Sequence, residues 1–261
     1  MFEMIMNMSL IGLSAMAGMM FLVWLAHIPL KNAGIVDVAW AFGLALLASI
    51  YAALGNGDEL RKWVFAAMAI VWGLRLTVHL FVRVVGHDED GRYAQMRKEW
   101  GGNIPVKFLV FFQFQALLNV FLAIPFLLVS INTHSGLSYF EIAGMIIWAA
   151  ALIGESVADH QLRIFKKDSS NKGKTCRNGL WNYSRHPNYF FEWLIWVSFF
   201  VFALGSPYGW ITVLCPALML YFLFKVTGIP ATEAQALRTK GDDYREYQRT
   251  TSAFVPWFQK S

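Results

Sequence analysis

The chain has 261 residues, of which 57% are hydrophobic and only 15% are charged, with a formal net charge of +5. A soluble globular protein has about 25% charged residues and a smaller apolar share. The composition therefore excludes an ordinary soluble enzyme, a disordered chain and a nucleic-acid-binding module, and it predicts a membrane protein. The two cysteines, Cys176 and Cys215, are too few for a disulfide framework.

Seven apolar segments approach or reach the roughly 20 residues that a helix needs to cross a membrane. They cover about 8–28, 34–54, 63–85, 106–130, 139–165, 188–205 and 208–227. The first segment has no basic stretch before it and no Ala-x-Ala cleavage site, so we expect it to stay in the mature protein. The sequence predicts an all-α bundle of seven transmembrane helices, with one transmembrane domain over residues 1–261.

The positions of Lys and Arg predict the orientation of the chain. Seven spans place the termini on opposite sides, and every Lys and Arg except Arg61, Lys62 and Arg75 then falls on one side. Because cytoplasmic loops carry the excess of Lys and Arg, we expect the N-terminus outside and the C-terminus in the cytoplasm. The positive charge is thus mainly a topology signal, and no nucleic-acid partner is expected. We expect a multi-pass protein of the bacterial inner membrane, or of the endoplasmic reticulum in a eukaryote.

Residues 230–261 read as a short, helical cytoplasmic C-terminal tail. We expect one helix over 231–238 and a second over 242–249, with Gly241 between them. Four apolar residues are expected to fold back onto the membrane face: Phe254, Val255, Trp257 and Phe258.

Ionisable and amide side chains are few in the apolar segments, where each charge costs about 3 kcal/mol unless it is paired or faces water. Most lie in the expected cytoplasmic half, which predicts a polar cavity that is open to the cytoplasm and closed on the other side. Arg75 and His79 are four residues apart and share one helix face. The set comprises Asp37, Arg75, His79, Gln113, Gln115, Asn119, Glu155, Asp159, His160, Arg163, Asn188 and Glu192.

A structural role is the alternative for part of this set. In that interpretation Asp37 and Arg75 form a buried ion pair that joins two helices, and Glu155 and Asp159 cap a helix end. A channel or transporter is disfavoured, because the outer halves of the spans carry few polar groups and no internal repeat is visible.

The most specific stretch is TCRNGLWNYSRHPNYFFEWLIW, residues 175–196. Pro187 suits the first turn of a helix, and Asn188 and Glu192 then lie on one face. Three basic side chains crowd the same position: Arg177, Arg185 and His186. Because a helix N-terminus attracts anions, the stretch predicts a site for a phosphate-bearing nucleotide or lipid head group. The alternative is a basic loop that touches anionic lipid.

Several common chemistries lack their motifs. No G-x-G-x-x-G follows a strand, so a Rossmann dinucleotide fold is excluded. No His/Cys cluster or C-x-x-C pair predicts a catalytic metal, and no G-x-S-x-G elbow supports serine chemistry.

The stretches NGLWNYSRHPNYFFEWLIW, ESVADHQLRIFKK and EAQALRTKGDDYREYQRTTSAFVPW resemble the steroid 5α-reductase family, in its bacterial branch of 3-oxo-5α-steroid 4-dehydrogenase-like membrane proteins. The stretches NAGIVDVAW, WGLRLTVHLFVR and DEDGRYAQMRKEWG are similar to the same branch, so the resemblance reaches from about residue 31 to 258. The Arg-His-Pro element alone also resembles isoprenylcysteine and phospholipid methyltransferases.

The resemblance implies a seven-helix membrane reductase that binds NADPH from the cytoplasmic side. Its partners would be membrane lipids and a lipophilic, steroid- or enone-like substrate, in which a carbon–carbon double bond conjugated to a carbonyl is reduced. The loop and the resemblance together give these expected cofactor-binding residues: Glu155, Asp159, Arg163, Lys174, Arg177, Arg185, His186, Asn188, Tyr189, Glu192, Tyr244 and Tyr247.

The substrate side departs from the family, in which a Gln–Glu pair on the second span and a tyrosine on the third hold the carbonyl. Here Asp37 stands for the acid, and Trp72 replaces the tyrosine. Negative charge on a carbonyl oxygen needs a preplaced donor or cation. We expect protonated Asp37, Arg75 or His79 in this catalytic role, with Tyr93 as a further candidate.

Two other functions compete with the reductase. One is an S-adenosylmethionine-dependent methyltransferase that acts on a lipid or prenyl group. The seven basic residues over 163–185 suit a phosphorylated dinucleotide better, and such a methyltransferase needs no polar groups deep in the second and third spans. The other is a non-enzymatic lipid-binding or scaffold protein.

Overall fold

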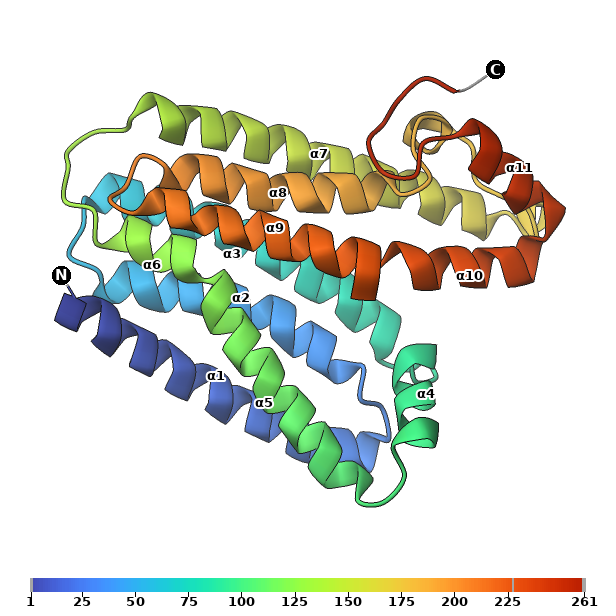
Figure 1. The fold of residues 1–261 in the computed structure, drawn as a ribbon, viewed down its shortest axis with the longest axis horizontal. Helices are drawn as coiled ribbons and strands as arrows, with labels where there is room; N and C mark the ends of the chain where they lie inside the picture. Colours follow the sequence, from blue (N-terminus) through green and yellow to red (C-terminus); the bar gives the residue numbers. More distant parts are fainter. Residues whose placement is uncertain (1, 227, 260–261) are drawn as a thin grey trace. The chain divides into compact units, whose positions relative to one another are not determined.

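The computed structural model describes residues 2–226 and 228–259. In these residues the secondary structure consists of helices (Figure 1) and one isolated β-bridge between Ser184 and Ser252. The chain divides into two compact units. Unit 1 comprises Met1–Ser138 with Gly205–Gly209, and unit 2 comprises Tyr139–Leu204 with Trp210–Ser261. The end of the predicted span 208–227 and the last two residues of the predicted tail lie outside the described residues.

Six helical stretches of the described chain are long and apolar enough to cross a membrane, so this is a multi-pass membrane protein. They are Phe2–Leu30, Ile35–Leu54, Glu59–Val84, Ile104–Ser130, Tyr139–Lys167 and Gly209–Lys240. The predicted span 188–205 is a helix of 17 residues, Pro187–Ala203. At 1.5 Å per residue it is about 26 Å long, shorter than the roughly 30 Å hydrocarbon core. The seven-span count, and the orientation of the termini that follows from it, stay predictions.

Unit 1 is a set of closely packed helices in which small residues line the contact between α2 and α3. A Cβ added at Gly73 would lie 3.1 Å from the Cβ of Ala45 and 3.2 Å from the carbonyl oxygen of Ala41. Small residues let helix backbones approach in this way within membranes. The helices are α1 (Phe2–Leu30), α2 (Ile35–Leu54), α3 (Glu59–Val84), α4 (Gly91–Trp100), α5 (Ile104–Leu122) and α6 (Ile124–Ser130).

The predicted span 106–130 is divided into α5 and α6. Pro125 lies in the first turn of α6 and has no N–H to continue the helical hydrogen bonds. Two amides of this span join helices to one another: Gln113 Nε2 donates to the Ala17 carbonyl at 3.3 Å, and Asn119 Nδ2 donates to the Trp40 carbonyl at 3.1 Å. These two polar residues of the predicted cavity therefore hold α5 against α1 and α2.

A buried arginine fixes the loop that follows α6. Arg61, at the start of α3, is only 2% exposed, and its guanidinium donates to three backbone carbonyls, those of Asn132, His134 and Gly136. Charged donors are strong, and buried carbonyls are costly to leave without a partner.

We therefore expect Arg61→Leu to lower the free energy of unfolding by about 3 kcal/mol. Thermal unfolding of the purified protein in detergent measures this effect, and Lys98→Gln on the exposed face of α4 is the matched loss of one positive charge. Equal stability of the two variants would show that the guanidinium does not hold the loop.

Unit 2 is built on the long helix α7, which lies against α8 (Figure 1). A Cβ added at Gly144 of α7 would lie 2.8 Å from the backbone nitrogen of Phe202 in α8, so the two backbones are in close approach. The α-helices are α7 (Tyr139–Lys167), α8 (Pro187–Ala203), α9 (Leu214–Tyr221), α10 (Ile229–Lys240) and α11 (Asp242–Thr250). Shorter turns are η1 (Ser169–Asn171), η2 (Gly179–Asn182), η3 (Gly209–Val213) and the π-helical η4 (Phe222–Val226).

The chain after α9 contains two helices where the sequence predicts them. Gly241 separates α10 from α11 and has a φ of +57°, a conformation that glycine adopts without strain. Phe254 then returns to the helices, and its ring lies 5.6 Å from that of Phe190 and 5.8 Å from that of Trp193. Of the four apolar residues expected to fold back, Phe254 is thus buried in unit 2, while Val255, Trp257 and Phe258 are exposed.

Candidate functional site

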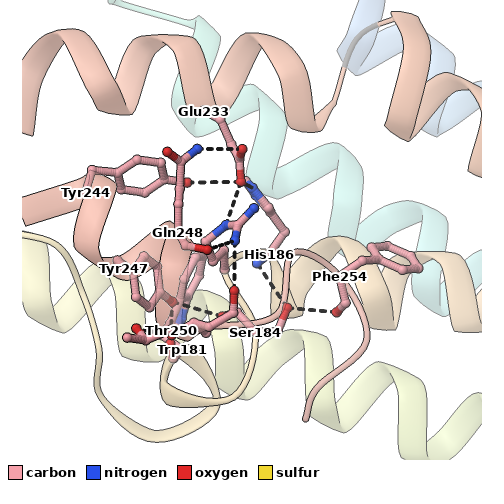
Figure 2. A network of polar contacts seen from close by, with 11 residues as sticks. Trp181, Ser184, His186, Glu233, Tyr244, Tyr247, Gln248, Thr250 and Phe254 are labelled. Carbon is pink, nitrogen blue, oxygen red and sulfur yellow. Dashed lines mark hydrogen bonds and ion pairs between the residues drawn. The ribbon is translucent and has the colours of Figure 1, made fainter. Parts of the chain in front are cut away.

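The start of α8 is fixed by the C-terminal segment of the chain. Pro187 occupies the first turn, as predicted, and the backbone N–H of His186 donates to Ser184 Oγ at 3.1 Å. Ser184 Oγ in turn donates to the carbonyl of Phe254 at 2.7 Å (Figure 2). Phe254, far along the chain, thereby holds the residues just before the helix in place.

The predicted acids of α7 and the predicted amide of α8 are brought together. Asn188 Nδ2 donates to Asp159 Oδ1 at 3.3 Å. Glu155 lies one turn before Asp159 and is buried, and Glu192 lies one turn after Asn188 and is half-buried. Four of the predicted cofactor residues therefore lie on the two packed helices. The alternative that Glu155 and Asp159 cap a helix end is wrong, because α7 continues to Lys167.

Glu233 on α10, which was not among the predicted site residues, is the centre of a polar network (Figure 2). Its Oε1 accepts from Arg185 Nε at 2.7 Å and lies 3.2 Å from His186 Nε2. Its Oε2 accepts from Gln248 Nε2 at 2.9 Å. The sequence offered one sign of this role. Glu233 is an acid at the start of the stretch EAQALR, and the loop before α8 has a surplus of basic residues that need an acidic partner.

Two arginines that were predicted to bind phosphates hold the C-terminal helices. Arg185 Nη1 donates to the carbonyls of Gln248 and Thr251, at 2.9 and 2.8 Å. Arg177 Nη2 donates to Asp243 Oδ1 at 3.1 Å and to the backbone carbonyl of Asp243 at 2.9 Å. Burial opposes ionisation of Asp243, but hydrogen bonds from Thr175 and the charge of Arg177 outweigh it, so its pKa lies below the usual value.

Two other predicted basic residues lie outside this network. Lys174 is exposed, and Arg163 Nη2 lies 3.0 Å from His160 Nδ1 on the exposed face of α7. The roles of Lys174, Arg177 and Arg185 toward a phosphate, and of Arg163 toward the cofactor, stay predictions.

The predicted tyrosines all lie at this end of unit 2. Tyr247 Oη donates to the carbonyls of Trp181 and Ser184, the latter at 3.0 Å. Burial raises the pKa values of Tyr244 and Tyr247, so both hydroxyls keep their protons and act as donors. The ring of Tyr189 stacks on that of His186 with 5.3 Å between centroids. These contacts fix the tyrosine side chains beside the start of α8.

In unit 1, Asp37 is held by two residues of α4. Its Oδ2 accepts from Arg92 Nη2 at 3.0 Å, and its Oδ1 accepts from Tyr93 Oη at 2.7 Å. Arg92 Nε also contacts Asp90 Oδ1 at 3.2 Å. The alternative of an Asp37–Arg75 ion pair is therefore wrong, because the ionic partner of Asp37 is Arg92.

A cavity of about 220 Å³ opens beside Asp37, and Asn32, Arg83, Asp90 and Arg92 are among its lining residues. Burial opposes the charge of Arg92, but Asp37 and Asp90 outweigh it and raise its pKa. Burial and the nearby Asp37 raise the pKa of Tyr93. Asp37 thus accepts from two groups that stay protonated at neutral pH, and its expected role as a protonated donor stays a prediction.

Arg75 and His79 lie one turn apart on α3, as their spacing predicts. Arg75 is half-buried and His79 is exposed. Their catalytic role stays a prediction. In the described part of the chain, no three His, Cys, Asp or Glu side chains are grouped so that they could hold a metal ion.

Comparison with known proteins gives a partial match and a family. Over 90 residues the chain is 36% identical to the probable O-methyltransferase ustE of Ustilaginoidea virens. The aligned part covers 34% of this chain and 30% of that protein, so the likeness concerns a minor part of each. No solved structure matches the chain.

The family match is much longer. Residues 23–251 match the model of a family described as a protein of unknown function, DUF1295, which includes steroid 5α-reductase-like membrane proteins. Since this match covers most of the sequence, the chain belongs to the DUF1295 family.

Proposed function

We propose that this protein is a membrane-embedded, NADPH-dependent reductase that reduces a carbon–carbon double bond conjugated to a carbonyl in a lipophilic, steroid-like substrate. The observation that carries the proposal is the acid–amide pair of Asp159 and Asn188, 3.3 Å apart on α7 and α8. Membership in a family that includes steroid 5α-reductase-like proteins supports it.

The donors and acceptors of unit 2 fit a nicotinamide nucleotide. A carboxylate and an amide together accept from and donate to a carboxamide and ribose hydroxyls, which is the role we assign to Asp159 and Asn188. Lys174 has an exposed ammonium that suits a phosphate. Bound NADPH would supply the hydride, and the protein would orient it and exclude water.

Unit 1 by itself holds polar side chains that suit a developing oxyanion. When hydride adds to the β-carbon, negative charge develops on the carbonyl oxygen and must be stabilised in place. We assign this to the Arg92 guanidinium, which Asp37 holds at the cavity, while Tyr93 orients Asp37. A proton then reaches the α-carbon and completes the reduction. Arg75 and His79 stay candidates for holding the oxyanion.

Methyl transfer is the second candidate, and the name of the partly similar ustE favours it. In this alternative the protein transfers a methyl group from S-adenosylmethionine to a lipid, and Asp159 binds ribose hydroxyls of that ligand. The two functions differ in what unit 1 must do, because methyl transfer forms no carbonyl oxyanion.

Ligand-induced stabilisation separates the two functions. The purified full-length protein in detergent is heated with NADPH, NADH or S-adenosylmethionine. We expect stabilisation by NADPH alone, worth about 2.7 kcal/mol at 100 times the Kd. A shift with S-adenosylmethionine alone would establish methyl transfer instead, and no shift with any of the three would contradict both functions.

The double variant Asp159→Ala, Asn188→Ala then tests the assigned site. We expect its Kd for NADPH to rise about 100-fold, because each lost hydrogen bond to the ligand is worth roughly a factor of ten. Isothermal titration measures the change. Asp242→Ala removes an exposed carboxylate in the same unit and should leave the affinity unaltered. Wild-type affinity in the double variant would refute the assignment.

A further inference from the structure

The segment after α11 is a fixed part of unit 2 with an exposed apolar edge. Phe254 anchors its middle, since its ring lies 5.2 Å from that of Phe224 and it belongs to a core with Leu223 and Ile229. The backbone N–H of Trp257 donates to the carbonyl of Tyr183 at 2.9 Å. The segment is therefore a shaped surface that the fold maintains.

This segment, the end of α11 and Arg185 line an open cavity of about 440 Å³. This volume is within the usual range of small-ligand pockets. Its polar lining includes Arg185, Arg249, Thr251 and Ser252, and its apolar lining includes Trp257 and Phe258. The lining of the cavity thus combines basic and aromatic side chains.

The two arginines differ in their electrostatic surroundings. Arg185 is paired with Glu233, so its charge is balanced within the protein. Within α11, Arg245 forms an ion pair with Asp242. Among the described residues, Arg249 takes part in no ion pair. Arg249 therefore gives the cavity a positive charge that an anionic ligand can balance.

The apolar edge has the composition of a membrane interface. Trp257 is 68% and Phe258 76% exposed, and Val255 and Tyr183 are exposed beside them. The rings of Trp257 and Phe258 lie 6.4 Å apart, and those of Phe258 and Tyr183 lie 6.2 Å apart. Aromatic side chains gather where head groups meet acyl chains, and basic pockets there bind anionic lipids.

We propose that this cavity binds the phosphate of an anionic membrane lipid. Arg249 pairs with the phosphate, Thr251 and Ser252 contact the head group, and Trp257 and Phe258 enter the boundary with the acyl chains. The site is distinct from the Asp159–Asn188 pair, and the proposal does not depend on reductase activity.

Native mass spectrometry of the full-length protein in detergent tests the proposal. The probes are phosphatidylglycerol, phosphatidylcholine and soluble glycerol phosphate. We expect the wild type to prefer phosphatidylglycerol to phosphatidylcholine, and Arg249→Gln to weaken phosphatidylglycerol binding about fivefold. Arg249→Lys should keep the preference. The matched control is Arg245→Gln, one turn away on the same helix and paired with Asp242, which should also keep it.

The aromatic side is tested separately. The double variant Trp257→Ala, Phe258→Ala should weaken the binding of both lipids and leave the binding of glycerol phosphate unchanged, because only the lipids contact the apolar edge. Thermal unfolding verifies that each variant is folded.

Four outcomes would overturn the proposal. They are no lipid preference in the wild type, equal losses in Arg245→Gln and Arg249→Gln, glycerol phosphate bound as tightly as the lipid, and loss of NADPH affinity in Arg249→Gln with lipid binding intact. Equal losses in the two arginine variants would mean that diffuse surface charge attracts the lipid. Tight binding of glycerol phosphate would indicate a site for free phosphate, and loss of NADPH affinity would indicate a nucleotide site.

Discussion

Replacing Glu233 by alanine is expected to release the C-terminal segment from the loop before α8 and to lower the free energy of unfolding by about 3–5 kcal/mol. The carboxylate binds Arg185 and His186, whose side chains are only 11% and 3% exposed. Its loss would leave a buried guanidinium without its counter-ion. Breaking a buried pair by removing one partner costs far more than the pair contributes on its own.

Hydrogen exchange over residues 242–259, together with thermal unfolding, measures this release. Glu246→Ala is the control, since Glu246 is exposed and lies 3.5 Å from Arg177, and a surface pair of this kind contributes little. Glu233→Gln keeps one acceptor oxygen and should have an intermediate effect. Unaltered exchange in Glu233→Ala would mean that other contacts hold the segment.

The second large effect is expected at Asp37. If the proposed reduction is correct, Asp37→Asn should slow NADPH-dependent turnover of a conjugated enone about 100-fold, because Arg92 loses the carboxylate that aligns it. Arg92→Gln should have a similar effect. The double variant should be no worse than either one, since the two residues act as a unit.

The kinetic constants separate this role from a general loss of structure. We expect kcat to fall while the Kd for NADPH is unchanged, because the residues assigned to the cofactor lie in unit 2. The control is Glu99→Gln, which removes a carboxylate from the exposed face of α4, the helix that carries Arg92. Additive losses at Asp37 and Arg92 would rule out a shared role.

Long apolar runs and turn residues predict much of the fold. The six apolar helical stretches, the first turn of α8 at Pro187 and the break at Gly241 all follow from local sequence. The α4 helix was missed because its ten residues are mostly polar and carry no apolar periodicity. Asp90 accepts from the N–H of Arg92 and begins this helix, and Tyr93 anchors it against Phe111 at 6.2 Å.

The candidate site was harder to predict because its partners are distant in sequence. Helical spacing relates Arg75 to His79 and Asn188 to Glu192, since each pair lies on one helix. Helical spacing cannot predict the contact between Asp37 and Arg92, because these residues are 55 positions apart and meet only through tertiary packing. Glu233 and Arg185 are 48 residues apart, and for the same reason no local pattern assigns that acid to that base.

The link between Ser184 and the C-terminal segment also sets an order of events during synthesis. The partners of this loop, Glu233, Thr251 and Phe254, follow it by 48 to 70 residues. At about 5–20 residues per second, the ribosome supplies them several seconds after α8 has been made. The loop before α8 therefore cannot reach its final structure while the chain is being inserted, and this part of the protein is completed only after translation has passed Phe254.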